Sequence, residues 1–533
     1  MTGSRQTNAS FFRAGKILPL LLTCLLATPA PAQDLRIGMK AAVDASDPHQ
    51  SYTPNRNVQF HVWEPLVAQD VHVRAAPGLA TSWRAIEPTL WEFKLAAAKF
   101  SDGTPFGAED VIFSINRARA AEGVRTYRIY VRDIVAMEAV DARTVRMRTR
   151  APAPLLPANL AAFSIVSARA AEGAVEADFN GGRAAPGTGP YRWVKFTPGS
   201  DVTLDRNPQW RGAQEPWQKV TFRFVPNDSA RTAGLLAGDL DLIDTVPPSL
   251  YARVSESERT KLLSTTSGFT LYFHLDQFRD RSPFVVGTDG KPLDRNPLRD
   301  LRVRRAMSMA LNRTAIAERA MEGGAEPAGQ FMPPGFDGHE AGLAIPPYDP
   351  AAARRLLAEA GYPQGFGLTL HCTSDRYAGD GRVCQTVAQM LTTIGIKSAV
   401  EALPSAVFFR RAGTATTETE FSAQMAIYSN LSGIGAENMN AVVRTLDGVR
   451  GVGTTNRGRF SNPELDRLLT EADASLDPAQ RDPLVAQATR FAMDQVGVIP
   501  IFHMKGSWGL RRALTMTPRG DQYTYATDVR TAP

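Results

Sequence analysis

The first 32 residues of this chain determine where it folds. They contain a few basic side chains, then the apolar run ILPLLLTCLLA, then the small-residue triplet APA ending at Ala32; the basic side chains are Arg5, Arg13 and Lys16. This order is that of a secretory signal peptide, and the apolar run is too short to span a bilayer. We therefore expect cleavage after Ala32 and a mature protein in the periplasm. Cys24 raises lipidation as an alternative, but Thr23 is a poor residue before a lipidated cysteine.

Export also determines the chemistry of the cysteines. Once residues 1–32 are removed, Cys372 and Cys384 are the only two that remain. In an oxidising compartment two thiols at this spacing are expected to form a disulfide, which would stabilise the fold by about 3 kcal/mol in the chain-entropy model. Two separate buried thiols are the alternative. No second pair of ligands stands at zinc spacing, so we expect no metal site and no cofactor.

The charge balance argues against a nucleic-acid partner. The full chain has a formal net charge of +6, and removal of residues 1–32, which hold three basic and no acidic side chains, lowers it to +3. Basic residues do not cluster with aromatic ones, as they do where a phosphate backbone is bound. No later segment is apolar for long enough to span a membrane.

The length and the pattern of the chain predict an α/β protein with several domains. At 533 residues the chain is too long for one hydrophobic core. Strand patterns such as VTFRFV (220–225) alternate with helical ones. One helix is clearly delimited, with Asp349 as N-cap, Pro350 in its first turn and Gly361 after its end, and another is predicted over 58–67. The spacing is not that of a barrel, so we expect mixed sheets and more than one lobe.

The stretch FSDGTPFGAEDVIFSINRA (100–118) contains several strong turn and helix signals, although it has no catalytic motif. Asp102 and Gly103 predict a tight turn, because Asp can bond its own backbone and Gly accepts positive φ. A helix is predicted to start near Gly107, with Glu109 and Asp110 in a first turn whose dipole favours carboxylates. The apolar side chains of one face would then be buried, namely Val111, Ile112, Ile115 and Ala118.

Motifs of catalysis do not occur in the sequence. There is no HExxH, CxxC or GxSxG pattern and no Walker loop. The glycine-rich stretch GVRGVGTTNRG (448–458) lacks the strand-to-helix context of a phosphate loop, and we interpret it as a flexible surface loop. The seven histidines are isolated, which is more typical of satisfied core or surface residues than of ligands.

Seven segments together resemble one protein family. In chain order they are PGLATSW (77–83), LWEFKLAAAKFSDGTPFGAEDVIFSINRA (90–118), GTGPYRWVKF (187–196), LRDLRVRRAMSMALNRTAI (298–316), YDPAAARRLLAEAGYPQGF (348–366), FSNPELDRLLTEAD (460–473) and VIPIFHMKGSW (498–508). Each is weak alone, but their order over nearly the whole mature chain is highly specific. The chain resembles the extracytoplasmic solute-binding proteins of peptide/nickel/opine-type ABC importers, the family 5 solute-binding proteins.

The resemblance implies a two-lobed, periplasmic-binding-protein-like fold with mixed sheets, a hinge and an extra subdomain. The first lobe would be built from residues 33–72, 188–272 and 500–533. Residues 73–187 would form the extra subdomain of that lobe, and residues 273–499 the second lobe. Ligand would bind in the cleft between the lobes, which close over it because the closed state makes more ligand contacts.

The same resemblance implies binding without catalysis. The protein would bind a small solute, in first place a short peptide or peptide-like compound, and deliver it as a monomer to permease subunits in the inner membrane. A nickel chelate, an opine or a sugar-derived solute is the alternative in the same role. An exported hydrolase is an alternative of another class, and it would require clustered His, Ser or carboxylate groups in the cleft. A receptor module that signals without transport is a further one.

Candidate ligand contacts in the second lobe follow from a departure from the family pattern. In its peptide binders, an Asp in a Trp-x-x-Asp-like stretch holds the α-ammonium of the ligand through a charge-assisted pair. The comparable stretch here, FSAQMAIYSNLSGIGAENMNAVV (421–443), has neither Trp nor Asp. Tyr428, Asn430 and Ser432 occupy the region, and Glu437 follows. Either Glu437 replaces the Asp, or the ligand lacks a free α-amine; an ordinary strand end and loop is the plainer alternative.

Other candidate contacts come from the first lobe and the C-terminus. In DPHQSYTPNRNVQFHVWEPLV (47–67), which resembles the cleft-lining start of the family, His49 or Tyr52 could face the ligand. Trp508 could pack against ligand, although such a Trp is more often core beside the hinge. A nickel chelate would require more donors than one His. Arginines could pair with an anionic ligand, but a solvated face is the plainer interpretation for Arg410, Arg411 and Arg444.

Overall fold

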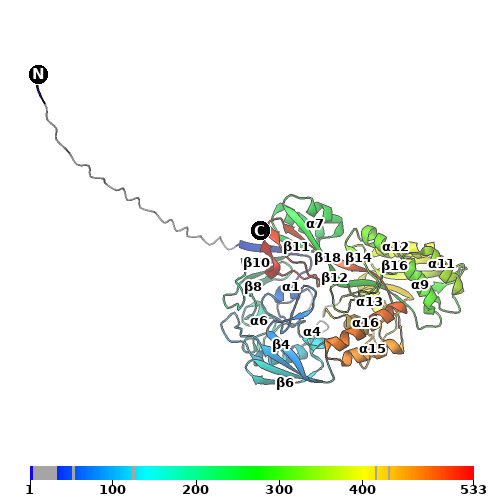
Figure 1. Cartoon of the computed structure of the whole chain (residues 1–533), viewed down its shortest axis with the longest axis horizontal. Coiled ribbons are helices and arrows are strands. Elements are labelled where there is room, and N and C mark those ends of the chain that lie inside the picture. The colour runs from blue at the N-terminus through cyan, green and yellow to red at the C-terminus, as the bar shows by residue number, and fades with distance from the viewer. Residues whose placement is uncertain (4–32, 51–53, 123–125, 414–416, 430–432, 533) are drawn as a thin grey trace.

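The computed structural model describes residues 1–3, 33–50, 54–122, 126–413, 417–429 and 433–532. Residues 4–32 of the predicted signal peptide lie outside these ranges. So do three of the candidate contacts, Tyr52, Asn430 and Ser432. Figure 1 shows two bodies side by side, with the long strands β12 (Thr260–Leu275) and β18 (Ile499–Arg511) between them. The fold is α/β with mixed sheets, as the sequence predicts.

A twelve-stranded sheet runs through both bodies, and β12 and β18 are its central antiparallel pair. On the first-lobe side β18 continues into β11 (Leu242–Asp244), β1 (Gln33–Met39), β10 (Trp217–Phe224), β9 (Asp201–Arg206) and β8 (Tyr191–Thr197). β1 is parallel to β10 and to β11, and the other pairs on this side are antiparallel. Alternate residues of these strands form the first-lobe core, for example Leu35 and Ile37.

On the second-lobe side β12 continues into β17 (Ala423–Ser429), which is antiparallel to it. The remaining strands there are β15 (Phe366–Thr373), β16 (Ile396–Leu403), β13 (Val285–Val286) and β14 (Ala325–Pro327). β15 is parallel to both β16 and β17. One core of this lobe packs against α9 (Leu301–Met309), α11 (Pro350–Glu359) and α12 (Asp380–Thr393). The other lies under α14 (Gly435–Val442), α15 (Pro463–Ala474) and α16 (Pro478–Asp494).

A separate four-stranded antiparallel sheet lies within the segment expected to form the extra subdomain. Its strands in spatial order are β4 (Ala80–Glu87), β5 (Leu90–Leu95), β7 (Thr144–Thr149) and β6 (Ile134–Asp141). Its hydrophobic core draws on residues 66–165, whereas buried residues of 166–185 belong to the first-lobe core. The boundary at residue 187 stays a prediction.

The FSDGTPFGAED stretch fixes this subdomain to the first lobe. Gly103 has φ +87° in the predicted turn, and Oδ1 of Asp102 accepts from the backbone N–H of Thr104 over 3.0 Å. The helix that follows, α2 (Ala108–Ala120), begins where Asp110 accepts from the N–H of Gly107 over 2.9 Å. The other oxygen of Asp110 accepts from the N–H of Ala168 over 2.8 Å. On the inner face Val111, Ile115 and Ala118 are fully buried and Ile112 is partly buried, as predicted.

Helix α11 confirms the predicted caps, whereas the helix predicted over 58–67 is mostly wrong. Asp349 accepts from the N–H of Ala352 over 2.8 Å. In the 58–67 region only α1 (Arg56–Gln59) is helical. The carbonyls of His61 and Val62 accept instead from the N–H groups of Tyr191 and Gly189, over 3.0 and 2.9 Å. Because these backbone acceptors bond to a distant segment, the helix cannot continue.

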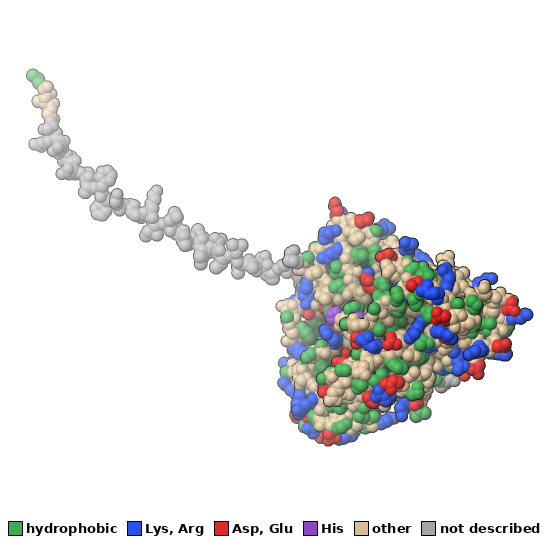
Figure 2. All heavy atoms as spheres, turned by 45° about the vertical axis from the view of Figure 1, so that its right-hand side comes forward, with side chains coloured by type: hydrophobic (Ala, Val, Ile, Leu, Met, Phe, Trp, Pro, Cys, Tyr) green, Lys and Arg blue, Asp and Glu red, His purple; other side chains and the backbone are tan. Residues whose placement is uncertain are grey.

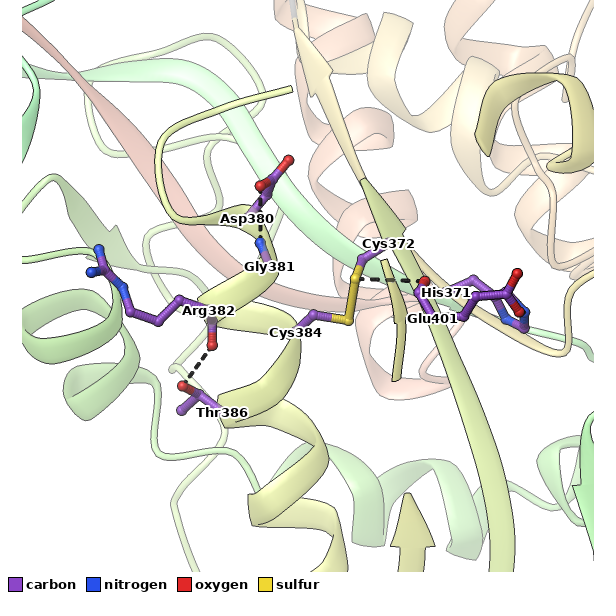
Figure 3. The surroundings of a disulfide bond; sticks show 8 residues. All are labelled: His371, Cys372, Asp380, Gly381, Arg382, Cys384, Thr386 and Glu401. Carbon is purple, nitrogen blue, oxygen red and sulfur yellow. Dashed lines mark hydrogen bonds and ion pairs between the residues drawn. A yellow bond between two sulfur atoms is a disulfide. The ribbon is translucent and has the colours of Figure 1, made fainter. Parts of the chain in front are cut away.

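Cys372 and Cys384 form a disulfide that joins β15 to α12, the two elements that pack in the second-lobe core (Figure 3). Both half-cystines are buried. The bridge therefore ties a strand of the large sheet to the helix that covers it.

The strand crossing between the lobes contains an irregularity. Thr266 of β12 pairs with Lys505, but Thr270 pairs with His503, so the register shifts between them. Ser267 lies in the irregular stretch, donates its hydroxyl proton to the carbonyl of Met504 over 2.7 Å and accepts from the amide of Gln522 over 2.8 Å. A bulge of this kind is where a ladder can bend.

The remaining elements are short or peripheral, and the surface is mixed in charge. They include α3 (Arg128–Val131), α4 (Leu156–Asn159), α7 (Asp228–Ala237), α8 (Tyr251–Ser255) and α13 (Ser405–Arg411). In Figure 2 Lys and Arg side chains alternate with Asp and Glu over the face in view. Within the described ranges, no helix combines the length and apolar character that a membrane crossing requires.

Candidate functional site

A cavity of about 660 Å³ lies between the extra subdomain and the second lobe. The subdomain contributes residues around α3 and α4, including Tyr130 and Asn159. The second lobe contributes the end of β17, helix α14 and the loop after it, including Tyr428, Glu437 and Thr454. Its volume is in the range of small-molecule sites. A second cavity of about 870 Å³ lies beside it, also between subdomain and second lobe, and shares Pro154.

The two lobes are in contact next to these cavities. Val73, at the start of the extra subdomain, is fully buried within a second-lobe cluster that includes Phe331 and Phe336. The turn that presents Val73 is held by Asp70, whose carboxylate accepts from the N–H groups of His72 and Arg74 over 2.8 and 2.9 Å. The loop that carries Val73 therefore packs against the second lobe.

Gly433 completes this contact from the second lobe. Its φ is +74°, and a Cβ at this position would overlap the carbonyl oxygen of Val73. Any other residue at position 433 would push the lobes apart. Gly433 and its neighbour Ile434 line the larger cavity, so the lobe contact and the cavity wall belong to one segment.

Tyr428 and Glu437 form a pair on the cavity wall. The Tyr428 hydroxyl donates to Oε1 of Glu437 over 3.2 Å. Burial, followed by the Glu437 charge, raises the pKa of Tyr428 well above its ordinary value. Tyr428 therefore stays protonated and orients a carboxylate toward the cavity. Two of the seven candidate contacts are thus brought together, while their part in binding stays a prediction.

The sheet face behind Tyr428 is unusually polar. Antiparallel pairing places Thr270 opposite Tyr428, Tyr272 opposite Ala426 and His274 opposite Gln424, so all six share one face. Tyr272 and His274 are buried, with their rings edge to face at 4.9 Å. The Tyr272 hydroxyl is buried without a hydrogen-bond partner among the described residues. Burial lowers the pKa of His274 well below its ordinary value, and a hydrogen bond to the backbone of Thr455 opposes this shift. An orphaned buried hydroxyl is rare in native interiors.

The glycine-rich loop 448–458 is part of the site. Gly451, Val452 and Thr454 line the 660 Å³ cavity, and the N–H of Gly453 donates to the carbonyl of Asn440 in α14 over 2.7 Å. Our interpretation of this stretch as a surface loop therefore covers only its tip, where Val449 is 99% exposed. Arg457, which sequence reasoning did not single out, follows the cavity-lining residues.

Two guanidinium groups near this loop have no carboxylate partner among the residues that the structure describes. Arg457 lies over the ring of Phe409, 5.5 Å from its centroid, and its Nε is buried without a partner. Arg376 approaches the same ring at 5.8 Å. By contrast Arg444, a sequence candidate for anion pairing, donates to Asp473 over 2.6 Å and is neutralised there. No composition signal distinguishes the first two from the many other arginines of the chain.

His49 lies in the interior of the first lobe. It is fully buried, its Nε2 donates to the carbonyl of Ser164 over 2.8 Å, and its ring lies against Phe163. Burial, together with the nearby positive charge of Arg117, lowers the pKa of His49 to about 4. Its part in ligand binding stays a prediction that this placement does not favour.

Trp508 lies in the first-lobe core beside the strand crossing. Its side chain is 1% exposed, and Nε1 donates to the hydroxyl of Thr524 over 2.8 Å. This placement agrees with the alternative interpretation, in which Trp508 is a core residue beside the hinge. The remaining candidates, Tyr52, Asn430 and Ser432, fall outside the described residues.

The lining of the cavity is rich in polar and charged side chains. It contains tyrosine, threonine, amide, arginine and carboxylate groups, and among its described residues there is no His, Ser or Cys. In the part of the chain that the structure describes, no three His, Cys, Asp or Glu side chains are grouped so that they could hold a metal. The arrangement offers hydrogen bonds and charges from both sides of the cavity.

Comparison with known sequences identifies relatives over nearly the whole chain. Residues 74–445 match the sequence model of the bacterial extracellular solute-binding proteins, family 5 (middle region). The chain is 27% identical over 504 residues to the glutathione-binding protein GsiB of Shigella dysenteriae, covering 92% of this chain and 93% of that protein. This match covers more of the chain than the family model, which ends at residue 445.

Solved structures share the fold. HbpA2 from Haemophilus parasuis superposes with a TM-score of 0.79 at 21% identity, covering 94% of this chain and 100% of that one. The ABC transporter-associated periplasmic binding protein DppA from Helicobacter pylori, in complex with the peptide STSA, superposes with a TM-score of 0.71 at 20% identity, covering 94% and 98%. The two-lobed architecture is therefore that of periplasmic binding proteins.

Proposed function

Because this chain belongs to family 5 of the bacterial extracellular solute-binding proteins, we propose that it binds a short peptide or peptide-like solute between its lobes and hands it to the permease of an ABC importer. The family consists of binding proteins, and this protein would catalyse no reaction on its solute. It would act as a monomer in the periplasm, after signal-peptide cleavage behind Ala32. The lobe division at 33–72, 73–187, 188–272, 273–499 and 500–533 belongs to the same proposal.

The observation that carries the proposal is the 660 Å³ cavity between the subdomain and the second lobe. Tyr130 reaches it from one side, and Tyr428 with Glu437 from the other. A ligand there would touch both lobes and would stabilise the closed arrangement, since only that arrangement offers all the contacts. A volume of this size suits a peptide of a few residues better than a free ion.

The polar groups support a peptide-like solute in particular. The Glu437 carboxylate, held by the Tyr428 hydroxyl at 3.2 Å, has the chemistry to receive an α-ammonium. Relatives point the same way: GsiB is described as binding glutathione, and the DppA structure contains the peptide STSA. We infer that Glu437 takes the place of the Asp used by peptide binders of the family. His49, Tyr52, Asn430, Ser432 and Trp508 remain the other candidates.

Transport rather than catalysis is the output that we propose. Delivery requires a permease that recognises the closed form, and the contact of Val73 with the second-lobe cluster is available only when the lobes meet. The register shift between Thr266 and Thr270 is the part of β12 that would bend on opening.

A thermal-shift screen of the mature protein tests the function. Ligand that binds only the native closed state must raise the melting temperature. Di- to pentapeptide mixtures should raise it, while oligosaccharides, nickel chelates and opines should not; mass spectrometry of ligand retained on purification is the second readout. A shift with one of the latter classes and none with peptides would replace the ligand class, and no shift with any solute would count against solute binding.

A further inference from the structure

We propose that the second cavity, of about 870 Å³, receives a large apolar group of the solute, so that the transported compound carries a bulky hydrophobic part beside its peptide-like part. This inference rests on the proposed function, because it narrows the chemical class of the ligand that binds between the subdomain and the second lobe. It is carried by the apolar walls of the second cavity, by the pairing of its charged side chains and by its continuity with the 660 Å³ cavity.

Most of the residues that line the second cavity are apolar, and they come from both sides of the gap. The hairpin of β4 and β5 contributes Trp83, Ile86 and Trp91. The second lobe contributes Ile434, Leu476 and Pro478. The volume is within the range of small-molecule sites. Because removal of apolar surface from water is favourable, these walls favour an apolar group over water.

The charged side chains of this lining are already paired within the protein. Asp337 accepts from the backbone N–H of Gly435 over 3.2 Å, and Asp477 accepts from that of Ala479 over 3.0 Å. The other charged side chains form ion pairs, namely Arg74 with Asp70, Arg84 with Glu92, Glu87 with Arg148 and Arg481 with Asp482. Since these charges are compensated within the protein, the apolar walls determine which group of a solute fits.

Two contacts between the subdomain and the second lobe lie at this cavity. Gly433, which lines it, is so close to Val73 that a Cβ would overlap the Val73 carbonyl oxygen. Leu476, which also lines it, belongs to the loop between α15 and α16 of the second lobe but packs against the hydrophobic core of the subdomain. A group bound here would touch both sides of the gap, so it would add to the contacts that favour the closed arrangement.

One polar group of the wall also lacks a partner. The Trp91 side chain is 6% exposed, and its indole Nε1 is buried without an acceptor among the described residues. A buried indole N–H usually has an acceptor. A solute with an acceptor atom beside its apolar part is one source of it.

The two cavities meet at Pro154, which lines both of them. Ile434, the N-cap residue of α14, lines the second cavity, and Glu437, in the first turn of the same helix, lines the first. A short peptide with its α-ammonium at Glu437 could therefore extend past Pro154 and place a large side chain in the second cavity. A peptide of small residues would leave the apolar walls hydrated and should bind less tightly.

Four tripeptide libraries built from Gly, Ala and Ser test the inference on the mature protein. Three of them carry Phe at the first, second or third position, and the fourth lacks Phe. Binding is measured by isothermal titration calorimetry. The wild type should bind at least one Phe library about tenfold more tightly than the library without Phe, because burial of a Phe side chain favours binding by at least that factor.

Two variants change the cavity from its opposite sides. Ile86→Glu and Ile434→Ser should each reduce the preference for Phe severalfold or more and leave the binding of the library without Phe nearly unchanged. Val140→Glu is the matched control and should keep the preference. Val140 lies on β6 of the same subdomain sheet, is 41% exposed and is not among the described residues that line either cavity.

The outcomes separate this inference from the function on which it rests. If the wild type binds all four libraries equally, or if a folded cavity variant keeps the full preference for Phe, the second cavity does not receive the solute and peptide binding stands. If Val140→Glu loses the preference as well, the effect is not local to the cavity and the inference fails. If no library binds, the peptide ligand fails and the inference fails with it. Circular dichroism shows which variants are folded.

Discussion

The hydroxyl of Tyr428 and the carboxylate of Glu437 lie 3.2 Å apart on the wall of the cavity between the lobes. Tyr428 is the next-to-last residue of β17 and Glu437 lies in the first turn of α14, so the pair spans the segment where this chain departs from its family. A carboxylate positioned by a buried tyrosine is suited to an α-ammonium. The first prediction follows from this pair.

Glu437→Gln should weaken the binding of peptides with a free α-amine by about tenfold or more, because one charge of a charge-assisted pair is lost. It should hardly change the binding of N-acetylated peptides. Asp133→Asn removes a negative charge from the opposite wall of the same cavity and should have little effect on either class. Isothermal titration calorimetry measures all four combinations. Equal losses for free and acetylated peptides would show that Glu437 does not contact the amine.

Gly433→Ala should prevent full closure. The added Cβ would overlap the carbonyl of Val73 in the opposite lobe. We expect weaker ligand binding with a folded protein, and a larger radius of gyration in the presence of ligand by small-angle X-ray scattering. Gly103→Ala controls for backbone strain, because Gly103 also has positive φ, at +87°, but no atom lies within 4 Å of its Cβ position. If Gly433→Ala binds and closes like the wild type, the lobe contact described here is not part of closure.

Reduction of the Cys372–Cys384 bridge should destabilise the second lobe. The bond connects β15 to α12 across 12 residues, and a loop of that size is worth about 3 kcal/mol in the chain-entropy model. The melting temperature should fall in the presence of a thiol reductant, and also in Cys384→Ser without reductant. Thiol titration of denatured, unreduced mature protein should find no free cysteine. Two titratable thiols would contradict the bridge.

Stability should fall as the pH drops from about 6.5 to 4. Burial lowers the pKa of His49 and His61 to about 4, so the folded protein binds their protons less tightly than the unfolded chain does. Their contribution is present above pH 6.5 and is lost through this window, by up to about 3 kcal/mol for each. His49→Gln, measured by urea unfolding at several pH values, should reduce the slope by the share of one proton. A slope unchanged from wild type would contradict the buried neutral His49.

Local features of the fold were predictable from the sequence because their determinants lie within a few residues. The turn at Asp102 and the cap at Asp349 are of this kind, and both occur as expected. The helix predicted over 58–67 failed because its carbonyls bond to Tyr191 and Gly189, more than a hundred residues away. The hydrophobic periodicity of a segment carries no information about hydrogen bonds to such a distant part of the chain.

The residues of the candidate site could be predicted only in part, for the same reason. Tyr428 and Glu437 lie nine residues apart, and the departure from the family pattern identified them. The loop 448–458 and strand β12 are distant in sequence, and Gly458 meets the carbonyl of Leu275 only in the folded chain. His49 is the opposite case. The sequence motif suggested a residue that lines the cleft, but its side chain is fully buried in the core.

The central claim is that a short peptide-like solute binds between the lobes and holds them closed. Calorimetric titration of mature protein, freed of retained ligand by partial unfolding and refolding, with di- to pentapeptide mixtures tests it most directly. We predict saturable binding at one site per chain, accompanied by a higher melting temperature. Absence of binding by every peptide mixture, with saturable binding of an opine, nickel chelate or oligosaccharide, would contradict it.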